Sequence, residues 1–359
     1  MKKTSNKHAR KKIRLAIVGT GGMANVHAGE LLKNKGVELV AVCDVNPERA
    51  TAFAAKHAPN AAVYTDFGKL LREVKPDAVS NVTPDNLHAP LTLQAIAAGC
   101  HVLCEKPLAT NYADALKMAK AAKKAGVINM VNFTYRNAPA IQKARELVRS
   151  GKLGEIVHVE ASYLQSWLAS KGWGDWKTSP HWLWRLSSRH GSKGVLGDVG
   201  VHILDYASLP VGPIRSVNAR LKTFTGLKGK KRGEYTLDAN DSALMNVEFA
   251  NGALGVIHTS RWATGYPNSV FLRLHGTKGA LRIDMDKSPN TLEVCLGPDI
   301  DKYVWKTVKA PPAPTIYQRF IAAVRSGKNG EPDFARGAEI QKILDACFVS
   351  EKTGRAVKV

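Results

Sequence analysis

An aspartate and a histidine, Asp198 and His202, lie four residues apart in a segment of glycine and apolar residues. On an α-helix this spacing puts both side chains on one face, with Cβ atoms about 5 to 6 Å apart. The carboxylate could orient a hydroxyl group, and the imidazole, with an ordinary pKa of about 6.5, could take its proton. The pair predicts acid–base chemistry on an alcohol, although an N-cap and a buried structural ring are the alternatives for the two residues.

A lysine, Lys106, follows the short apolar run His101–Cys104 and precedes a proline. At the carboxyl end of a strand in a parallel sheet it would project into the crevice that binds ligands, where it could anchor a hydroxyl or donate a proton. A lysine at a strand end is otherwise usually a solvated charge. Because no third ligand is signalled near Asp198 and His202, a metal site is not favoured.

A glycine-rich turn follows an apolar run, Leu15–Val18, and opens a helical stretch. In this context the GxGxxA pattern predicts a dinucleotide site. Gly19 permits the tight turn, Gly21 lets the backbone approach a pyrophosphate, and Ala24 lets the helix pack closely on the sheet. The first amides of the helix would then face the anion.

An acid, Asp44, ends the second predicted strand, where it could accept hydrogen bonds from a ribose and repel a 2′-phosphate. NAD is therefore expected over NADP, although Arg49 nearby could still admit a phosphate; a helix cap is the alternative role for Asp44. After the strand Ala78–Val82, the turn Thr83–His88 is a second expected cofactor contact, or a plain entry to a helix.

From Ile13 to about Met130, apolar runs of strand length alternate with Ala-rich helical patterns, which is typical of βαβ units around a doubly wound parallel sheet. Strands are expected at Leu15–Val18, Leu39–Cys43, Ala78–Val82, His101–Cys104 and Ile128–Val131. Helices are expected at Met23–Lys35, Pro47–His57, Gly68–Val74, Pro90–Ala98 and Tyr112–Ala125.

The remainder of the chain predicts an α+β region with a large, open and mostly antiparallel sheet. Helices are expected at Ile141–Ser150, Asp198–Leu209, Ile316–Ser326 and Ala335–Glu351, and an irregular Trp-rich stretch at Ser166–Gly197. Strands are expected at Ile156–Gln165, Ser216–Phe224, Ser242–Phe249, Leu254–Arg261, Val270–His275 and Ala280–Ile283.

Composition narrows the class of protein. The 359 residues are 44% hydrophobic and contain no run approaching the ~18 to 20 apolar residues of a membrane span, so neither a membrane protein nor a membrane partner is expected. The net charge of +22 is spread diffusely, apart from the tail Met1–Lys12 and the segment Lys228–Arg232, and no base-stacking aromatics accompany it, so nucleic acid is not favoured. Five scattered cysteines without CxxC pairs and the lack of an export segment indicate reduced thiols and a cytoplasmic location.

Several motifs together resemble the glucose-fructose oxidoreductase / inositol dehydrogenase / MocA family across essentially the whole chain. They are the glycine turn at 19–24, Thr83-Pro84 through His88, Glu105-Lys106-Pro107, Tyr135-Arg136 with Pro139, and Gly-Asp-x-Gly-x-His-x-x-Asp at 197–205. The resemblance implies an NAD(P)-dependent dehydrogenase or reductase that acts on CH–OH groups of a sugar or cyclitol. It makes Lys106 the active-site lysine, Asp198 the acid that positions the hydroxyl, and His202 the base.

The resemblance also implies how the sites divide. The expected cofactor contacts are Gly19, Thr20, Gly21, Gly22, Met23, Ala24, Asp44, Arg49, Thr83, Pro84, Asn86, His88, Glu105, Lys106 and Arg136. The expected substrate contacts are Lys106, Tyr163, Gln165, Trp184, Arg185, Asp198 and His202, whose aromatic rings and amides suit the faces and hydroxyl edges of a sugar.

The expected domains are a basic tail at 1–12, an NAD-binding Rossmann domain at 13–135, and a substrate and oligomerisation domain at 136–359 whose last helices could pack back on the Rossmann domain. The open sheet is expected to form a homodimer or homotetramer. Two other functions fit the same residues: a glycoside-cleaving enzyme that retains NAD and oxidises its substrate transiently, and a catalytically silent NAD-binding regulator.

Overall fold

The computed structural model describes residues 12–224 and 227–359, and these form two compact units. The first unit comprises residues 12–108, 116–132 and 316–335, and the second comprises residues 109–115, 133–315 and 336–359. The boundary therefore lies at Asn132 rather than Tyr135, and the first of the two last helices belongs to the first unit. Most of the basic tail, residues 1–11, falls outside the described residues.

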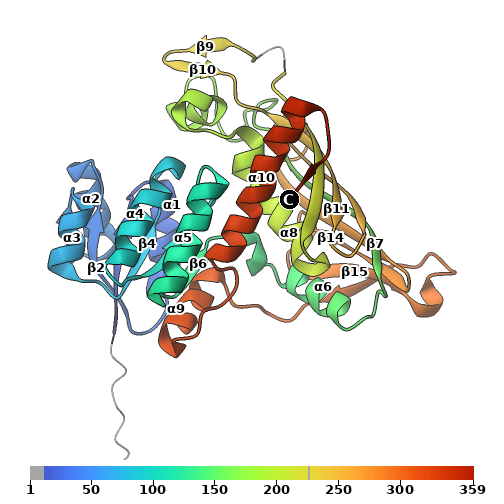
Figure 1. Ribbon diagram of the computed structural model, residues 1–359, viewed down its shortest axis with the longest axis horizontal. Helices are drawn as coiled ribbons and strands as arrows, with labels where there is room; N and C mark the ends of the chain where they lie inside the picture. Colours follow the sequence, from blue (N-terminus) through green and yellow to red (C-terminus); the bar gives the residue numbers. More distant parts are fainter. Residues whose placement is uncertain (1–11, 225–226) are drawn as a thin grey trace, which may run out of the picture. The chain divides into compact units, whose positions relative to one another are not determined.

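The first unit is built on a six-stranded, wholly parallel sheet in the order β3-β2-β1-β4-β5-β6 (Figure 1). Its strands are β1 (Ile13–Val18), β2 (Val37–Cys43), β3 (Ala62–Tyr64), β4 (Ala78–Asn81), β5 (His101–Cys104) and β6 (Asn129–Val131). Its helices are α1 (Gly22–Leu32), α2 (Pro47–His57), α3 (Phe67–Val74), α4 (Asp85–Ala97), α5 (Tyr112–Ala125) and α9 (Ile316–Ser326). The expected doubly wound fold is confirmed.

Helix α9 completes the core of this unit although it lies nearly two hundred residues beyond β6 in the chain. Its Phe320 and Ile321 are fully buried with Leu15 and Ile17 of β1 in a single apolar cluster. Strands β1 and β4 are buried almost throughout, as strands of a parallel sheet covered on both faces are expected to be.

Two details of the first unit differ from expectation. Strand β3 was not predicted, because its three residues are largely exposed and carry no alternating pattern. Helix α4 begins at Asp85, five residues before the expected start, and contains Pro90. Pro90 lies in the second turn of α4, where it removes one helical hydrogen bond, and the helix continues past it to Ala97.

The second unit is built on a nine-stranded sheet in the order β16-β15-β14-β13-β7-β12-β11-β8-β17, in which β7 and β12 are the parallel pair. The strands are β7 (Ile156–Gln165), β8 (Ile214–Lys222), β11 (Ser242–Phe249), β12 (Leu254–Ser260), β13 (Asn268–Gly276), β14 (Gly279–Asp284), β15 (Thr291–Leu296), β16 (Lys306–Lys309) and β17 (Val357–Lys358). Helices α6 (Pro139–Arg149) and α8 (Val201–Val211) pack against this sheet. The last helix is α10 (Phe334–Thr353).

The Trp-rich stretch forms a small cap of its own. It consists of the short helical segments α7 (Pro180–Leu183), η2 (Trp184–Leu186) and η3 (Ser188–His190), with the unpredicted hairpin of β9 (Lys230–Arg232) and β10 (Tyr235–Leu237), as Figure 1 shows. Trp167, Trp176, Leu186 and Leu237 are buried together in its apolar centre.

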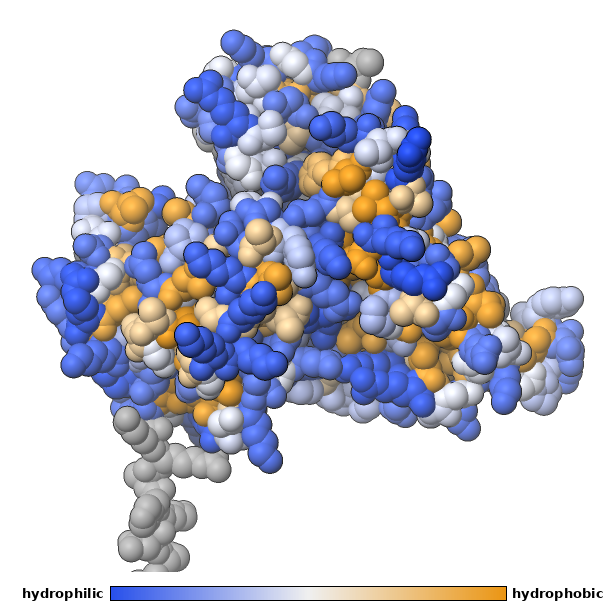
Figure 2. Space-filling model, viewed as in Figure 1, coloured by the Kyte–Doolittle hydropathy of each residue, from blue (hydrophilic) through white to orange (hydrophobic). Residues whose placement is uncertain are grey.

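Hydrophilic side chains dominate the surface drawn in Figure 2, with smaller hydrophobic patches between them. Over residues 12–224 and 227–359, no helix combines the length and the apolar character that crossing a bilayer requires.

Candidate active site

The glycine turn of the first unit links β1 to α1 in the way that a dinucleotide site requires. Gly19 has φ +84°, and a Cβ there would meet the carbonyl oxygen of Val82 at 2.6 Å, so no other residue fits. At Gly21 and Gly22 an added Cβ would meet nothing within 4 Å. Open space thus lies before the first amides of an eleven-residue helix, where a pyrophosphate fits.

The acid at the end of β2 is tightly held. Asp44 accepts hydrogen bonds from the amide and hydroxyl of Thr20, both 2.8 Å, and from Arg49 through Nε at 3.1 Å and Nη2 at 2.5 Å. Burial alone would raise the pKa of Asp44, but the bonds from Arg49, two amides and the hydroxyl outweigh it and lower the pKa to about 2. Asp44 therefore stays an acceptor beside the glycine turn, as a ribose site requires.

The turn after β4 divides into two roles. Thr83 is partly exposed and its hydroxyl donates to Asn81 Oδ1 at 2.7 Å, while Asn86 is exposed in the first turn of α4. His88 is buried, and its ring bridges the carbonyl oxygens of Thr83 (2.9 Å) and Pro107 (2.7 Å). These two hydrogen bonds make His88 a structural link between two loops, whereas the sequence predicted a contact with the cofactor.

A buried polar network supports the end of β5. Glu105 is 7% exposed and its Oε1 lies 2.7 Å from His27 Nε2 and 2.5 Å from Asn132 Nδ2. His27, on α1, is 2.7 Å from Ser80 Oγ through Nδ1. Burial would raise the pKa of Glu105, but His27 and the neighbouring Lys106 hold it low, at about 2.

This network fixes the backbone that carries Lys106. The other carboxylate oxygen of Glu105 accepts the amide of Lys106 at 3.1 Å. Lys106 itself is partly exposed at the carboxyl end of β5, as its position in the sequence predicted. Glu105 thus acts on Lys106 through the backbone as well as through charge.

In the second unit, Asp198 and His202 lie at the junction of two helical forms. Residues Leu196–Gly200 form a π-helical turn that continues into α8, so the predicted single α-helix is wrong in its first turn. The flanking Gly197 and Gly200 leave the backbone free to widen there, and such turns are frequent at functional sites. Asp198 is 27% exposed at its side chain, and His202 is 7% exposed.

An aromatic and amide wall surrounds His202. The ring of Tyr135 lies edge-on at 5.0 Å between centroids, and that of Tyr163 lies at 6.3 Å. The Tyr135 hydroxyl donates to the Tyr163 hydroxyl (2.6 Å), which donates to Asn268 Oδ1 (2.7 Å). Asn268 Nδ2 in turn donates to the Tyr135 hydroxyl (3.1 Å). Gln165 Nε2 also donates to Asn268 Oδ1, at 2.9 Å. Burial raises the pKa of Tyr163 well above its usual range, so it remains a neutral phenol.

Two cations lie beside Asp198, Arg185 of the cap and Arg261 after β12. Arg185 Nε lies 3.6 Å from Asp198 Oδ2, and its guanidinium is 4.6 Å from the ring centre of Trp184. Arg261 Nη2 donates to the same carboxylate oxygen at 3.0 Å. Five of the expected substrate contacts therefore lie in contact with one another or with shared neighbours in the second unit. They are Tyr163, Gln165, Arg185, Asp198 and His202.

Arg136 lies in a buried ion pair, whereas the sequence predicted a contact with the cofactor. It is 2% exposed and makes two hydrogen bonds to Asp205, at 2.7 and 2.6 Å, while Arg336 approaches the same carboxylate at 2.8 Å. Burial opposes the charge of Asp205, but the two guanidiniums lower its pKa to about 2. The geometry favours a structural ion pair for Arg136 over cofactor binding.

Several residues of these networks were not predicted from the sequence. His27, Asn132 and Asn268 are single polar residues in otherwise unremarked segments, and Arg261 ends a predicted strand. The only local signal is a histidine on the apolar face of α1. The others are brought into place by strand register, as Asn268 is by its pairing with Gln165.

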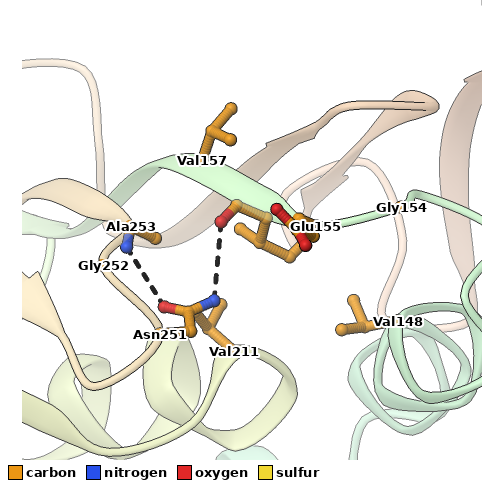
Figure 3. A pocket seen from close by; sticks show the side chains of 9 residues that line it. Val148, Gly154, Glu155, Val157, Val211, Asn251, Gly252 and Ala253 are labelled. Carbon is orange, nitrogen blue, oxygen red and sulfur yellow. Dashed lines mark hydrogen bonds between the residues drawn. The ribbon is translucent and has the colours of Figure 1, made fainter.

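A separate hollow of about 430 Å³ opens at the opposite end of β7 from Tyr163 and Gln165 (Figure 3). Asn251 spans it, donating to the carbonyl of Ile156 at 3.4 Å and accepting the amide of Ala253 at 3.1 Å. Among the described residues that line it, Glu155 alone carries an ionisable side chain. It therefore offers no acid–base pair.

Comparison with known proteins gives the same division of the chain. Residues 13–133 match the oxidoreductase family with an NAD-binding Rossmann fold, and residues 141–282 match the GFO/IDH/MocA C-terminal domain. D-glucoside 3-dehydrogenase of Escherichia coli is 37% identical over 69% of this chain and 70% of its own. Levoglucosan dehydrogenase of Pseudarthrobacter phenanthrenivorans is 28% identical over 86% of each chain.

Solved structures agree over nearly the whole length. An oxidoreductase domain protein from Kribbella flavida has a TM-score of 0.87 at 31% identity, covering 97% of this chain and 99% of its own. A levoglucosan dehydrogenase in complex with NADH and levoglucosan has a TM-score of 0.87 at 26% identity, covering 97% and 100%. The glycine turn, Asp44 at the end of β2 and both family domains are in place. This chain belongs to the Gfo/Idh/MocA family of NAD-dependent oxidoreductases.

Proposed function

We propose that this NAD-dependent oxidoreductase oxidises a secondary ring hydroxyl of a pyranose, either in a glycoside or in an anhydrosugar, and reduces the corresponding ketone in reverse. The observation that carries the proposal is the wall around His202, in which phenol and amide groups of Tyr163, Gln165 and Asn268 are joined by hydrogen bonds. Such groups match the hydroxyl edge of a sugar ring, and the aromatic faces match its apolar side. The relatives named for levoglucosan and D-glucoside support the same substrate class.

The proposed chemistry assigns one role to each residue. His202 takes the proton of the reacting hydroxyl, because imidazole is the side chain suited to proton transfer near neutral pH. Asp198, held beside two guanidiniums, accepts a hydrogen bond from a hydroxyl and orients the ring. Lys106 holds the reacting oxygen as its charge changes. The bound nicotinamide supplies or accepts the hydride.

The residues that would hold NAD are those whose geometry fits it. The amides after Gly19 would bind the pyrophosphate, and Asp44 would accept a hydrogen bond from the adenosine ribose. Thr83, Pro84 and the exposed Asn86, which follow β4, would contribute further contacts to the cofactor.

The test is a panel of levoglucosan, alkyl D-glucosides, free D-glucose and myo-inositol with NAD, followed by the absorbance of reduced nicotinamide. We expect stoichiometric NADH with at least one pyranose and the highest kcat/KM with a glycoside or anhydrosugar. Substrate consumption without net NADH would instead support glycoside cleavage through transient oxidation. NADH binding without turnover of any compound would support a regulator.

We also propose a homodimer or homotetramer in the cytoplasm. Leu244, Leu254 and Val256 project from the outer face of β11 and β12 with exposed fractions of 58%, 61% and 42%, and a second copy of the same apolar face would cover them. Light scattering of Leu244→Glu should show a smaller particle than the wild type. All five cysteines are buried free thiols, which suits a reducing compartment.

A further inference from the structure

Arg261, at the residue after β12, is the largest side chain that the structure buries completely, with 0% exposure. Removing a cation from water costs several kcal/mol unless its partners are well placed. Burial accordingly lowers the pKa of Arg261, while Asp198 acts in the opposite direction. The apolar core does not require a buried guanidinium. The role of Arg261 is therefore expected at Asp198, the carboxylate that it contacts.

The contacts of Arg261 join three separate segments. Nη2 donates to Asp198 Oδ2 at 3.0 Å, and Nη1 donates to the carbonyl oxygen of Arg185 in the cap, also at 3.0 Å. The guanidinium lies 5.0 Å from the ring centre of Trp167, over its face. A planar fork with fixed donor directions can hold such partners at once, whereas the single ammonium of a lysine cannot.

We infer that Arg261 is a positioning residue for the alcohol chemistry: it holds Asp198 as an oriented, charged acceptor and locks the cap to it. This inference rests on the proposed function, because it assigns Arg261 a role through Asp198 and none of its own on the substrate. Asp198 needs such a support, since it lies in a π-helical turn between Gly197 and Gly200 and its side chain is only partly buried.

The charge of Arg261 also acts on the base. Asp198 lies one turn from His202, and its negative charge favours the protonated ring, so a cation beside Asp198 offsets that effect. The other groups facing this site are Arg185 and His181 of the cap, Tyr135 of η1 (Thr134–Asn137), and Tyr163 of β7. Of these, Arg185 shares the charge compensation, and the two phenols are neutral near pH 7.

The experiment is a double-mutant cycle of Arg261→Met and Asp198→Asn, measured as kcat/KM on the best sugar from the panel. We expect Asp198→Asn to cost ~100-fold and Arg261→Met ~10-fold, as for loss of one oriented catalytic contact. In the Asp198→Asn background, Arg261→Met should cost less than ~2-fold, because coupled residues do not add. Losses that multiply in the double variant would overturn the inference.

Two readouts separate positioning from general damage. The Kd for NADH, from fluorescence titration, should stay within ~2-fold in every variant, because the contacts of Arg261 are with Asp198, Arg185 and Trp167 and with none of the residues assigned to NAD. The acid limb of kcat/KM against pH should move to higher pH in Arg261→Met and stay in place in Arg261→Lys, which keeps the charge. If the acid limb of kcat/KM against pH were the same in Arg261→Met as in the wild type, that result would also contradict the positioning role of Arg261.

The matched control is Arg282→Met. Arg282 likewise pairs with a carboxylate, through 2.7 and 3.1 Å contacts to Glu293, and lies 4.5 Å from the ring centre of Trp305, but it touches neither Asp198 nor the cap. It should leave kcat/KM within ~2-fold. A wild type that oxidises no sugar would refute the proposed function and this inference with it. An active wild type with multiplying losses would refute the inference alone.

Discussion

The polar contacts around the glycine turn and those around His202 are assembled in different ways. Around the glycine turn, the residues that meet are near neighbours in the chain or end adjacent parallel strands, as Thr20, Asp44 and Arg49 do. Around His202, Tyr163 meets Asn268 at a separation of 105 residues. A site for an invariant cofactor can be built locally, whereas a site for a variable substrate is drawn from loops and strands across a scaffold.

The two regions also differ in the ionisable groups that they contain. Asp44 and Glu105 have pKa values lowered to about 2, so the first unit keeps fixed anions at every ordinary pH. In the second unit, His202 lies among neutral phenols whose protons do not leave near pH 7. We therefore expect the pH dependence of turnover to come from the second unit and cofactor affinity to depend little on pH.

The largest effect should follow loss of the base. His202→Ala should lower kcat by ~10²- to 10⁴-fold, because general-base catalysis contributes on that scale. The Kd for NADH should remain within a few-fold of wild type if the two regions act separately. His158→Ala, which replaces an exposed histidine near the start of β7, is the control and should retain full activity. An equally active His202→Ala would remove His202 from the mechanism.

Replacing the lysine tests whether the division between the regions is complete. Lys106 belongs to the first unit in the chain but is assigned to the substrate, so Lys106→Met should lower kcat by ~10²- to 10³-fold and leave NADH affinity nearly unchanged. Stopped-flow rates and fluorescence titration measure the two quantities. Lys33→Met, on the exposed end of α1, serves as control. A weakened Kd with normal kcat would place Lys106 with the cofactor contacts instead.

Asp205 gives the largest expected effect on stability. Asp205→Asn should lower the free energy of unfolding at pH 7 by ~3 to 5 kcal/mol, because it leaves two buried guanidiniums without their carboxylate. Its pKa is depressed to about 2, so this contribution is present above pH ~4 and disappears as the pH falls toward 2.

Urea unfolding of both proteins across that pH range measures the difference, which should narrow as the pH falls. The control is Asp175→Asn, which removes an exposed pair with Lys171 and should change stability by less than ~1 kcal/mol at either pH. A difference that stays constant down to pH 2 would contradict the charged state assigned to Asp205.

The smallest effect concerns cofactor choice. Asp44→Ala removes the ribose acceptor and releases Arg49, so the ratio of kcat/KM for NAD over NADP should fall ~10-fold. Steady-state kinetics with both cofactors measure it, and Glu48→Ala, an exposed neighbour on α2, is the control. An unchanged ratio would mean that the ribose is recognised elsewhere, and the local character of the first region would be in doubt.

Local patterns predicted most of the first unit because its longer strands are mainly apolar and alternate with Ala-rich helical stretches. They missed β3, which is short and exposed, and they placed the start of α4 too late because Pro90 looks like a boundary. In the second unit the hairpin of β9 and β10 was missed because Lys230–Arg232 carries no apolar residue.

The substrate residues were predictable only in part, and for a physical reason. Tyr163 and Gln165 share a strand face by simple alternation, which the sequence displays. Asn268 and Arg261 reach the same region through sheet register and side-chain hydrogen bonds over long separations, which leave no periodic trace in the chain. The π-helical turn at Asp198 likewise has no pattern beyond its two glycines.

Helix α9 has a consequence for how the protein is made. The six-stranded sheet and its glycine turn are complete in the chain by Asn132, yet Phe320 and Ile321 are needed to close the core over β1. During synthesis, the nucleotide-binding unit therefore keeps an open apolar face while residues 133–315 of the second unit emerge from the ribosome. A chain ending before α9 should be captured by chaperones or aggregate, even though every residue assigned to NAD has already been translated.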